Sequence, residues 1–191
     1  MEVIFGLDTG ITGKKSVLTV GTFDGIHLGH REIIKELLKI AKEKDLVSSL
    51  LTFEPHPKTV VQDSPHRIKL LTTLEEKLEI LHKIGLERVI IAKFTREFSE
   101  MNYKNFVEEI LLSRLKSTHI IIGYDHSFGR NRIGNFRELE NLSKMFSFNL
   151  MEVGPFKIEN QTVSSTRIRA FIDDGDMGNA TQMLGHRYFL E

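Results

Sequence analysis

Two histidines, His27 and His30, stand three residues apart in a glycine-rich segment, residues 21–30, which reads GTFDGIHLGH. The segment lies between an apolar run at 16–20 and a helical pattern at 31–44. At such a junction, backbone N–H groups and the helix dipole favour an anion, and both imidazoles can donate to one phosphate chain. Neither a Walker A loop nor a Gly-x-Gly-x-x-Gly loop occurs there. The segment predicts a phosphate site; the alternatives are a turn with two solvated histidines or a zinc site, which lacks a third ligand nearby.

A second cluster, residues 163–169, reads VSSTRIR and places three hydroxyls at a predicted helix start. Hydroxyls there are ordinary N-caps, and that is the alternative interpretation. However, Arg167 and Arg169 fall close to the start of the helix, where cations oppose the helix dipole unless an anion is bound. An arginine fork also matches phosphate oxygens. The pattern therefore predicts a second anion site.

Two further segments are weaker candidates. The first, residues 123–132 (GYDHSFGRNR), offers Asp125 for sugar hydroxyls or a ring N–H and Phe128 to cover a flat ring; the alternative is a surface turn with Phe128 in the core. The second, residues 53–57 (FEPHP), has two prolines that are expected to stop both strand and helix. The alternative to a binding role is that these prolines only fix a rigid turn. Four other phenylalanines at strand or helix positions are expected in the core: Phe94, Phe98, Phe106 and Phe136.

Strand and helix patterns alternate along the chain. Strands are expected at 16–20, 46–53, 88–94, 119–123 and 148–153. Helices are expected at 31–44, between a Thr73–Glu76 capping box and Gly85, around 106–111, at 135–146 and after 164–166; residues 58–71 show no clear period. This alternation predicts an α/β fold with a doubly wound, mostly parallel sheet. Ligands of such sheets bind beyond the carboxyl ends of the strands, in the loops after Val20, Phe53, Phe94, Ile122 and Val153.

Composition excludes several kinds of chemistry. The 191 residues include no cysteine, which excludes a thiol nucleophile, a disulfide and a cysteine-ligated zinc, and suits the cytoplasm. The 26 basic and 26 acidic residues cancel, so no partnership with nucleic acid is expected. Neither a secretory signal nor an apolar run of about 18 residues, the minimum for a membrane span, is recognisable.

Four segments in order, 21–30, 52–57, 123–129 and 163–169, resemble the FMN adenylyltransferase (FAD synthetase) domain of the bacterial bifunctional riboflavin kinase/FMN adenylyltransferase family. A fifth likeness lies at 180–188. His27-Leu28-Gly29-His30 matches the HxGH signature of the wider nucleotidyltransferase superfamily, whose fold is Rossmann-like. The resemblance implies Mg²⁺-dependent transfer of an adenylyl group from ATP to FMN, giving FAD and pyrophosphate without a covalent enzyme intermediate.

The resemblance also implies roles for individual residues. It assigns no side-chain ligand to the metal. It implies ATP and FMN as the small-molecule partners, no membrane association and no particular oligomeric state. The implied catalytic residues are His27, His30 and Arg169; the ATP-binding residues are Gly21, Thr22, Phe23, Asp24, Gly25, Gly29, Gly123, Asp125, Ser164, Ser165 and Thr166; the flavin-binding residues are Phe53, Pro55, His56, Pro57, Phe128, Gly129 and Arg130.

Two departures from the family pattern bear on these expectations. His126 stands where the family usually has phenylalanine, which puts flavin contact by that side chain in doubt. Residues 1–191 are expected to form a single adenylyltransferase domain, with 176–191 as the lead-in to a riboflavin kinase domain that this chain lacks, so no kinase activity is expected. A stand-alone enzyme and a shortened bifunctional one both fit. The functional alternatives are another nucleotidyltransferase with a different phosphorylated acceptor, and a flavin- or nucleotide-binding regulatory module with little turnover.

Overall fold

The main sheet has six strands that all run parallel, in the order β1-β4-β3-β2-β5-β6. The computed structural model describes residues 1–7, 10–11, 13–61, 68–126, 129 and 134–188. Its strands are β1 (Glu2–Phe5), β2 (Ser16–Val20), β3 (Val47–Glu54), β4 (Arg88–Lys93), β5 (Ser117–Gly123) and β6 (Asn149–Val153). Strand order reverses at β2, so the prediction of a doubly wound parallel sheet is confirmed.

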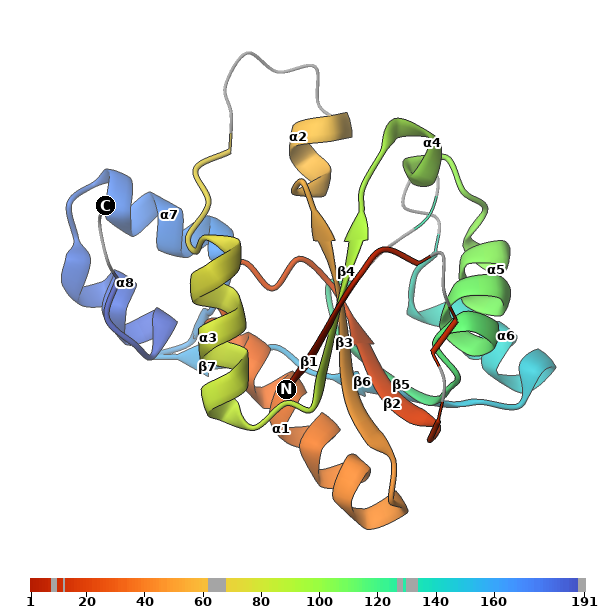
Figure 1. Cartoon of the computed structure of the whole chain (residues 1–191). Helices are drawn as coiled ribbons and strands as arrows, with labels where there is room; N and C mark the ends of the chain where they lie inside the picture. Colours follow the sequence, from red (N-terminus) through yellow and green to blue (C-terminus); the bar gives the residue numbers. More distant parts are fainter. Residues whose placement is uncertain (8–9, 12, 62–67, 127–128, 130–133, 189–191) are drawn as a thin grey trace.

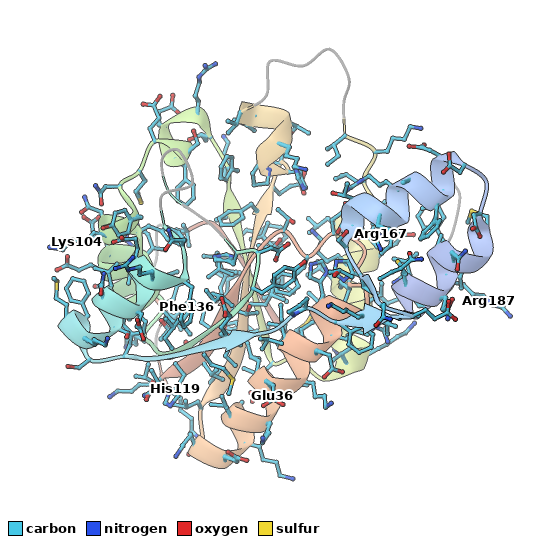
Figure 2. The ribbon with its side chains drawn as sticks, turned by 180° about the vertical axis from the view of Figure 1, so that it is seen from behind. Glu36, Lys104, His119, Phe136, Arg167 and Arg187 are labelled. Atoms are coloured by element: carbon cyan, nitrogen blue, oxygen red, sulfur yellow. The ribbon has the colours of Figure 1, made fainter. Side chains whose placement is uncertain are left out.

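Helices cover both faces of this sheet (Figure 1). On one face lie α1 (Leu28–Lys44) and α3 (Leu74–Ile84). On the other lie η1 (Phe106–Arg114) and α6 (Phe136–Phe146). Short helices occupy the connections: α2 (Pro57–Val61), α4 (Arg96–Ser99) and α5 (Tyr103–Asn105). Figure 2 shows the two sides from behind, with Arg167 on one side of the sheet and Lys104 and Phe136 on the other.

A small C-terminal layer is attached on the same side as α3 (Figure 1). It consists of an antiparallel pair, β7 (Lys157–Ile158) and β8 (Gln161–Thr162), followed by α7 (Ser165–Asp173) and α8 (Met177–Leu184). These elements share an apolar cluster that includes Val163, Ile168 and Leu184 and is completed by Leu71 from the segment before α3. Within the lead-in expected at 176–191, residues 177–184 form the packed helix α8.

The four inner strands, β4, β3, β2 and β5, are largely buried on both faces, which explains the apolar runs in their sequences. All five residues of β2 are buried, for example, because α1 covers one face and η1 the other. The expected helix between Thr73 and Gly85 is confirmed with both caps, since Thr73 and Glu76 form the reciprocal capping box and Gly85 adopts a left-handed conformation.

Several local expectations were wrong. The prolines after β3 do not stop helix formation, because Pro57 occupies the first position of α2, where its missing N–H costs nothing. The apolar stripe around Val107 is buried as expected, but it winds as a π-helix. The edge strand β1 was missed because its burial pattern is mostly exposed and carries no strand period. Of the expected core phenylalanines, Phe106 is buried, whereas Phe94, Phe98 and Phe136 are only partly so.

Candidate functional site

The glycine-rich loop between β2 and α1 is folded into the protein. Phe23, Gly25 and Ile26 all have positive φ angles, and the side chains of Phe23 and Ile26 are buried. A Cβ atom on Gly25 would lie 2.9 Å from Leu71 and 3.1 Å from Leu184, so only glycine fits. The interpretation as a solvated turn is therefore wrong, because the loop is part of the core at the carboxyl end of β2.

His27 and His30 lie together at the start of α1. His27 is the N-cap, and its Nδ1 accepts the backbone N–H of His30. The two rings stack with 3.6 Å between their centroids, and the Phe23 ring lies 4.8 Å from that of His30. Among the described residues, the buried Nδ1 of His30 has no hydrogen-bond partner. Only part of the expectation that both imidazoles face a phosphate chain fits this geometry, because one nitrogen of His27 already caps the helix.

Both imidazoles are held neutral. Burial lowers the pKa of His27 to about 4, and the charge of Arg169 acts in the same direction. Burial also holds the pKa of His30 well below its ordinary value, and electrostatic interactions with His27 and Lys77 lower it further. In the absence of ligand the pair thus presents neutral N–H donors, and a bound anion would favour the protonated forms.

Asp24 ties the loop to two other segments. Its buried carboxylate accepts the backbone N–H groups of Leu71 at 2.9 Å and Thr72 at 3.3 Å through Oδ1. Its Oδ2 accepts a hydrogen bond from the guanidinium of Arg169, which is itself largely buried. The Asp24 carboxylate is therefore fully engaged by protein groups in this structure, and its expected contact with ATP stays a prediction.

The start of α7 meets the glycine-rich loop, as expected for two parts of one site. Ser164 is the N-cap of α7, and the hydroxyl of Ser165 donates to the backbone carbonyl of Asp24 at 2.9 Å. Arg169 also donates to the carbonyl of Lys69 at 2.7 Å. Thr166, in contrast, is exposed, and Arg167 turns to Gln161. Ser165 and Arg169 are thus brought to the loop, whereas the other two residues lie outside this contact.

The turn after β3 lies within electrostatic reach of the same site. Burial lowers the pKa of His56 to about 4, while Asp24 raises it and Arg169 lowers it. His56 accepts the N–H of Lys58 through Nδ1, and the peptide bond before Pro55 is cis. Phe53 is half-buried and packs edge-on against Phe94, with 5.5 Å between ring centroids. Phe53 therefore serves the packing of the sheet whether or not it contacts a flavin.

The structure describes only part of the loop after β5. Asp125 is exposed, and a Cβ on Gly123 would lie 3.1 Å from Ile33 of α1, so this strand end approaches α1 closely. Gly129 has a positive φ and lies against Tyr103. The predicted flavin contacts Phe128 and Arg130 lie outside the described residues.

Residues that sequence reasoning missed also contact the glycine-rich loop, among them Lys77, Thr72 and His186. Lys77 of α3 donates to the carbonyl of Thr22 at 2.8 Å, and Thr72 accepts the N–H of Gly25 at 3.1 Å. His186 lies 2.9 Å from the carbonyl of Gly25 through Nε2. A signal existed only for Lys77, since a lysine among Leu74, Leu78 and Leu81 interrupts an apolar helical face.

Neither a metal cluster nor a membrane span is found in the part of the chain that the structure describes. There, no group of three or more histidine, aspartate or glutamate side chains is arranged to hold a metal ion. Within the same residues, no helix is long and apolar enough to cross a bilayer.

Comparison with known proteins identifies relatives over nearly the whole chain. The FAD synthetase family model matches residues 11–167. A bifunctional riboflavin kinase/FMN adenylyltransferase from Listeria monocytogenes is 35% identical over 93% of this chain and 56% of its own length. An FAD synthetase from the same organism is 32% identical over 93% of this chain and 71% of its own. The chain thus spans a little over half the length of the bifunctional relative.

Solved structures agree on the fold. A crystal structure described as a macrolide-efflux protein from Streptococcus pneumoniae superimposes with a TM-score of 0.86 at 27% identity, covering 97% of this chain and 60% of the other. A pantothenate synthetase from Thermus thermophilus superimposes with a TM-score of 0.56 at 12% identity, covering 97% of this chain and 81% of the other, which supports the fold alone.

The parallel sheet, its reversal at β2 and the loops gathered at its carboxyl edge define a doubly wound α/β protein of the Rossmann-like class. Within that class the matched family model covers most of the sequence, and the FAD synthetase relative aligns with 93% of it. The chain belongs to the FAD synthetase family.

Proposed function

We propose that this chain catalyses transfer of an adenylyl group from ATP to FMN, giving FAD and pyrophosphate. The observation that carries the proposal is the junction of the two predicted anion-binding segments, where Ser165 and Arg169 of α7 bond directly to Asp24 in the glycine-rich loop. The junction lies at the carboxyl edge of a parallel sheet, where ligands of this fold class bind. Membership of the FAD synthetase family supplies the substrate pair.

The proposed reaction is an in-line displacement at phosphorus. A phosphate oxygen of FMN forms a bond to the α-phosphorus of ATP while the bond to the bridging oxygen breaks, and pyrophosphate leaves with that electron pair. Such a transfer needs positioning and charge stabilisation and no protein nucleophile. This requirement is compatible with a site built from histidine, arginine and backbone N–H groups.

Within this proposal, His27 and His30 donate to the phosphates of ATP, and Arg169 stabilises the departing pyrophosphate. In the ligand-free protein Arg169 bonds to Asp24 and to the carbonyl of Lys69. Pyrophosphate would therefore share the guanidinium with Asp24 or replace it. The turn at 53–57 and the loop after β5 are assigned to the flavin, and the backbone of the glycine-rich loop to the nucleotide.

Mg²⁺ is proposed to enter with ATP, as part of the substrate. The one buried carboxylate of the described site, Asp24, is already bonded to two backbone N–H groups and an arginine. Magnesium bound mainly by phosphates and water fits such a site, because it needs few protein ligands. We further propose a cytoplasmic enzyme whose residues 1–191 form one catalytic domain.

The test is incubation of the purified chain with ATP, FMN and Mg²⁺, followed by chromatography of the flavins. FAD and an equal amount of pyrophosphate are expected, and chelation of Mg²⁺ is expected to stop their formation. Other phosphorylated acceptors and riboflavin are assayed on the same sample. Turnover of a different acceptor alone would identify another nucleotidyltransferase, and tight flavin binding without pyrophosphate release would identify a regulatory module; either result overturns the proposal.

A further inference from the structure

Lys77 is a buried cation with no role among those proposed above for the reaction. It lies in the first turn of α3, and only 6% of its surface is exposed. Its Nζ donates to the backbone carbonyl of Thr22 at 2.8 Å, within the glycine-rich loop. Among the residues that the structure describes, Lys77 forms no ion pair with a carboxylate. Burial lowers the pKa of its amine, as expected for an ammonium that lacks full compensation.

The fold itself does not require this charge. The carbonyl of Thr22 also accepts the hydroxyl of Thr52 at 3.2 Å, so it keeps a partner without Lys77. A buried ammonium beside a neutral carbonyl is costly, and its place in the first turn of a helix opposes the helix dipole as well. A methionine of similar length would fill the same space without that cost. The charge is therefore better explained by a ligand of opposite sign.

The surroundings of Lys77 indicate where that ligand would lie. Its charge is among the causes that lower the pKa of His30 in the glycine-rich loop and of His56 in the turn after β3. The acidic groups that act on it are Asp24, whose carboxylate is held by Arg169, and Glu54 at the end of β3. The ammonium thus acts on both the predicted nucleotide side and the predicted flavin side of the site.

We propose that Lys77 is a positioning residue for the phosphates of both substrates, providing a fixed positive charge between the glycine-rich loop and the turn after β3. Two anions must approach each other for the FMN phosphate to reach the α-phosphorus of ATP, and a buried cation reduces their repulsion. The hydrogen bond to Thr22 fixes the ammonium in place, while the charge does the electrostatic stabilisation. This inference rests on the proposed function.

The test compares binding in four proteins: wild type, Lys77→Met, Lys77→Gln and Lys83→Met. Lys77→Gln keeps a donor for Thr22 and removes the charge, whereas Lys77→Met removes both. Lys83 lies on the same helix but is exposed and paired with Glu79, so its substitution controls for the loss of one positive charge. Flavin fluorescence measures the dissociation constants of FMN and of riboflavin, which lacks the phosphate, and calorimetry measures that of ATP with Mg²⁺.

Both Lys77 variants are expected to bind FMN and ATP at least about 10-fold more weakly, one factor of ten corresponding to about 1.4 kcal/mol. Riboflavin binding should change less than twofold, urea unfolding should show no loss of stability, and Lys83→Met should match the wild type. Unchanged FMN affinity, equal losses for FMN and riboflavin, or rescue by Lys77→Gln would each overturn the inference.

The readout is independent of turnover. If the wild type binds ATP and FMN but forms no FAD, and the Lys77 variants still lose affinity for both, only the proposed function fails. If the wild type forms FAD and the Lys77 variants bind both substrates normally, only the role of Lys77 fails.

Discussion

Burial lowers the pKa values of individual histidines in this site. His27 has a pKa of about 4 in the folded chain, against an ordinary value of 6.5. Between these values the unfolded chain binds a proton that the folded chain does not, so the free energy of unfolding falls as the pH falls from 6.5 towards 4. His30 and His56 are shifted in the same direction and add to the effect.

We therefore predict that His27→Asn reduces the pH dependence of stability. Asparagine is a good N-cap, so the start of α1 is kept while the titrating ring is removed. The slope of unfolding free energy against pH should decrease by about 1.4 kcal/mol per pH unit, the equivalent of one proton. Urea unfolding between pH 4.5 and 7.5 measures it. His82→Gln, at an exposed position of α3, is the control; equal slopes in wild type and His27→Asn would contradict the prediction.

At the scale of the element, different positions along α1 serve packing and the candidate site. Ile34 faces the sheet and is fully buried, whereas His30, one turn earlier, faces the glycine-rich loop. The residues of a helix that face a parallel sheet are determined by packing. The residues of its first turn can instead contribute to a binding site formed with the preceding loop.

This division predicts opposite effects of two substitutions on α1. Ile34→Ala should lower the free energy of unfolding by about 2–5 kcal/mol through a cavity, with little change in turnover at a temperature where it stays folded. His30→Ala should lower FAD formation by about 100-fold or more, as expected for loss of a phosphate donor. It should also cost about 1 kcal/mol of stability, because its ring stacks on His27. Steady-state FAD formation measures the effect on turnover, and urea unfolding measures the effect on stability. An unchanged rate in His30→Ala would contradict the proposed role of His30 as a phosphate donor.

At the scale of the whole molecule, the C-terminal layer completes the site by docking on the glycine-rich loop. The docking uses the bonds of Asp24 to Ser165 and Arg169 and the contact of His186 with Gly25. A Cβ on Gly185 would collide with the side chain of Leu28, so the end of α8 also lies directly against the start of α1. Segments far apart in sequence thus share one centre, since Asp24 and Arg169 are separated by 145 positions.

Asp24 is therefore predicted to control the stability of the assembled site. Asp24→Ala should cost about 3–5 kcal/mol, because it leaves a largely buried arginine and two backbone N–H groups without their acceptor. Asp24→Asn should cost less, since one oxygen can still accept from Leu71 and Thr72. Asp45→Asn, which breaks an exposed pair with Lys14, should change the urea midpoint little. If Asp24→Ala and Asp45→Asn lowered the free energy of unfolding equally, the Asp24–Arg169 pair would not be what holds the C-terminal layer to the glycine-rich loop.

Much of this architecture can be predicted from the sequence, because it depends on local patterns. Strands buried on both faces need runs of apolar residues, such as Val17–Leu18 in β2 and the three isoleucines of β5. The capping box at Thr73 and the hydroxyl N-cap at Ser164 use neighbours within four residues. The same locality makes residues 21–30 recognisable as a candidate anion-binding loop. In contrast, β1 is a strand only because β4 offers it an edge, and no pattern of its own predicts that pairing.

The sequence by itself therefore determined the α/β class, the family and the two segments predicted to bind anions, since each is encoded in short-range spacing. Only the tertiary structure decided that Asp24 is bonded to Arg169, that Ser165 donates to the carbonyl of Asp24 and that Lys77 donates to the carbonyl of Thr22. These contacts join residues from different elements, and burial at their meeting point sets the charge of each group. Charge states and partners in a folded site depend on distances through space, which no spacing along the chain specifies.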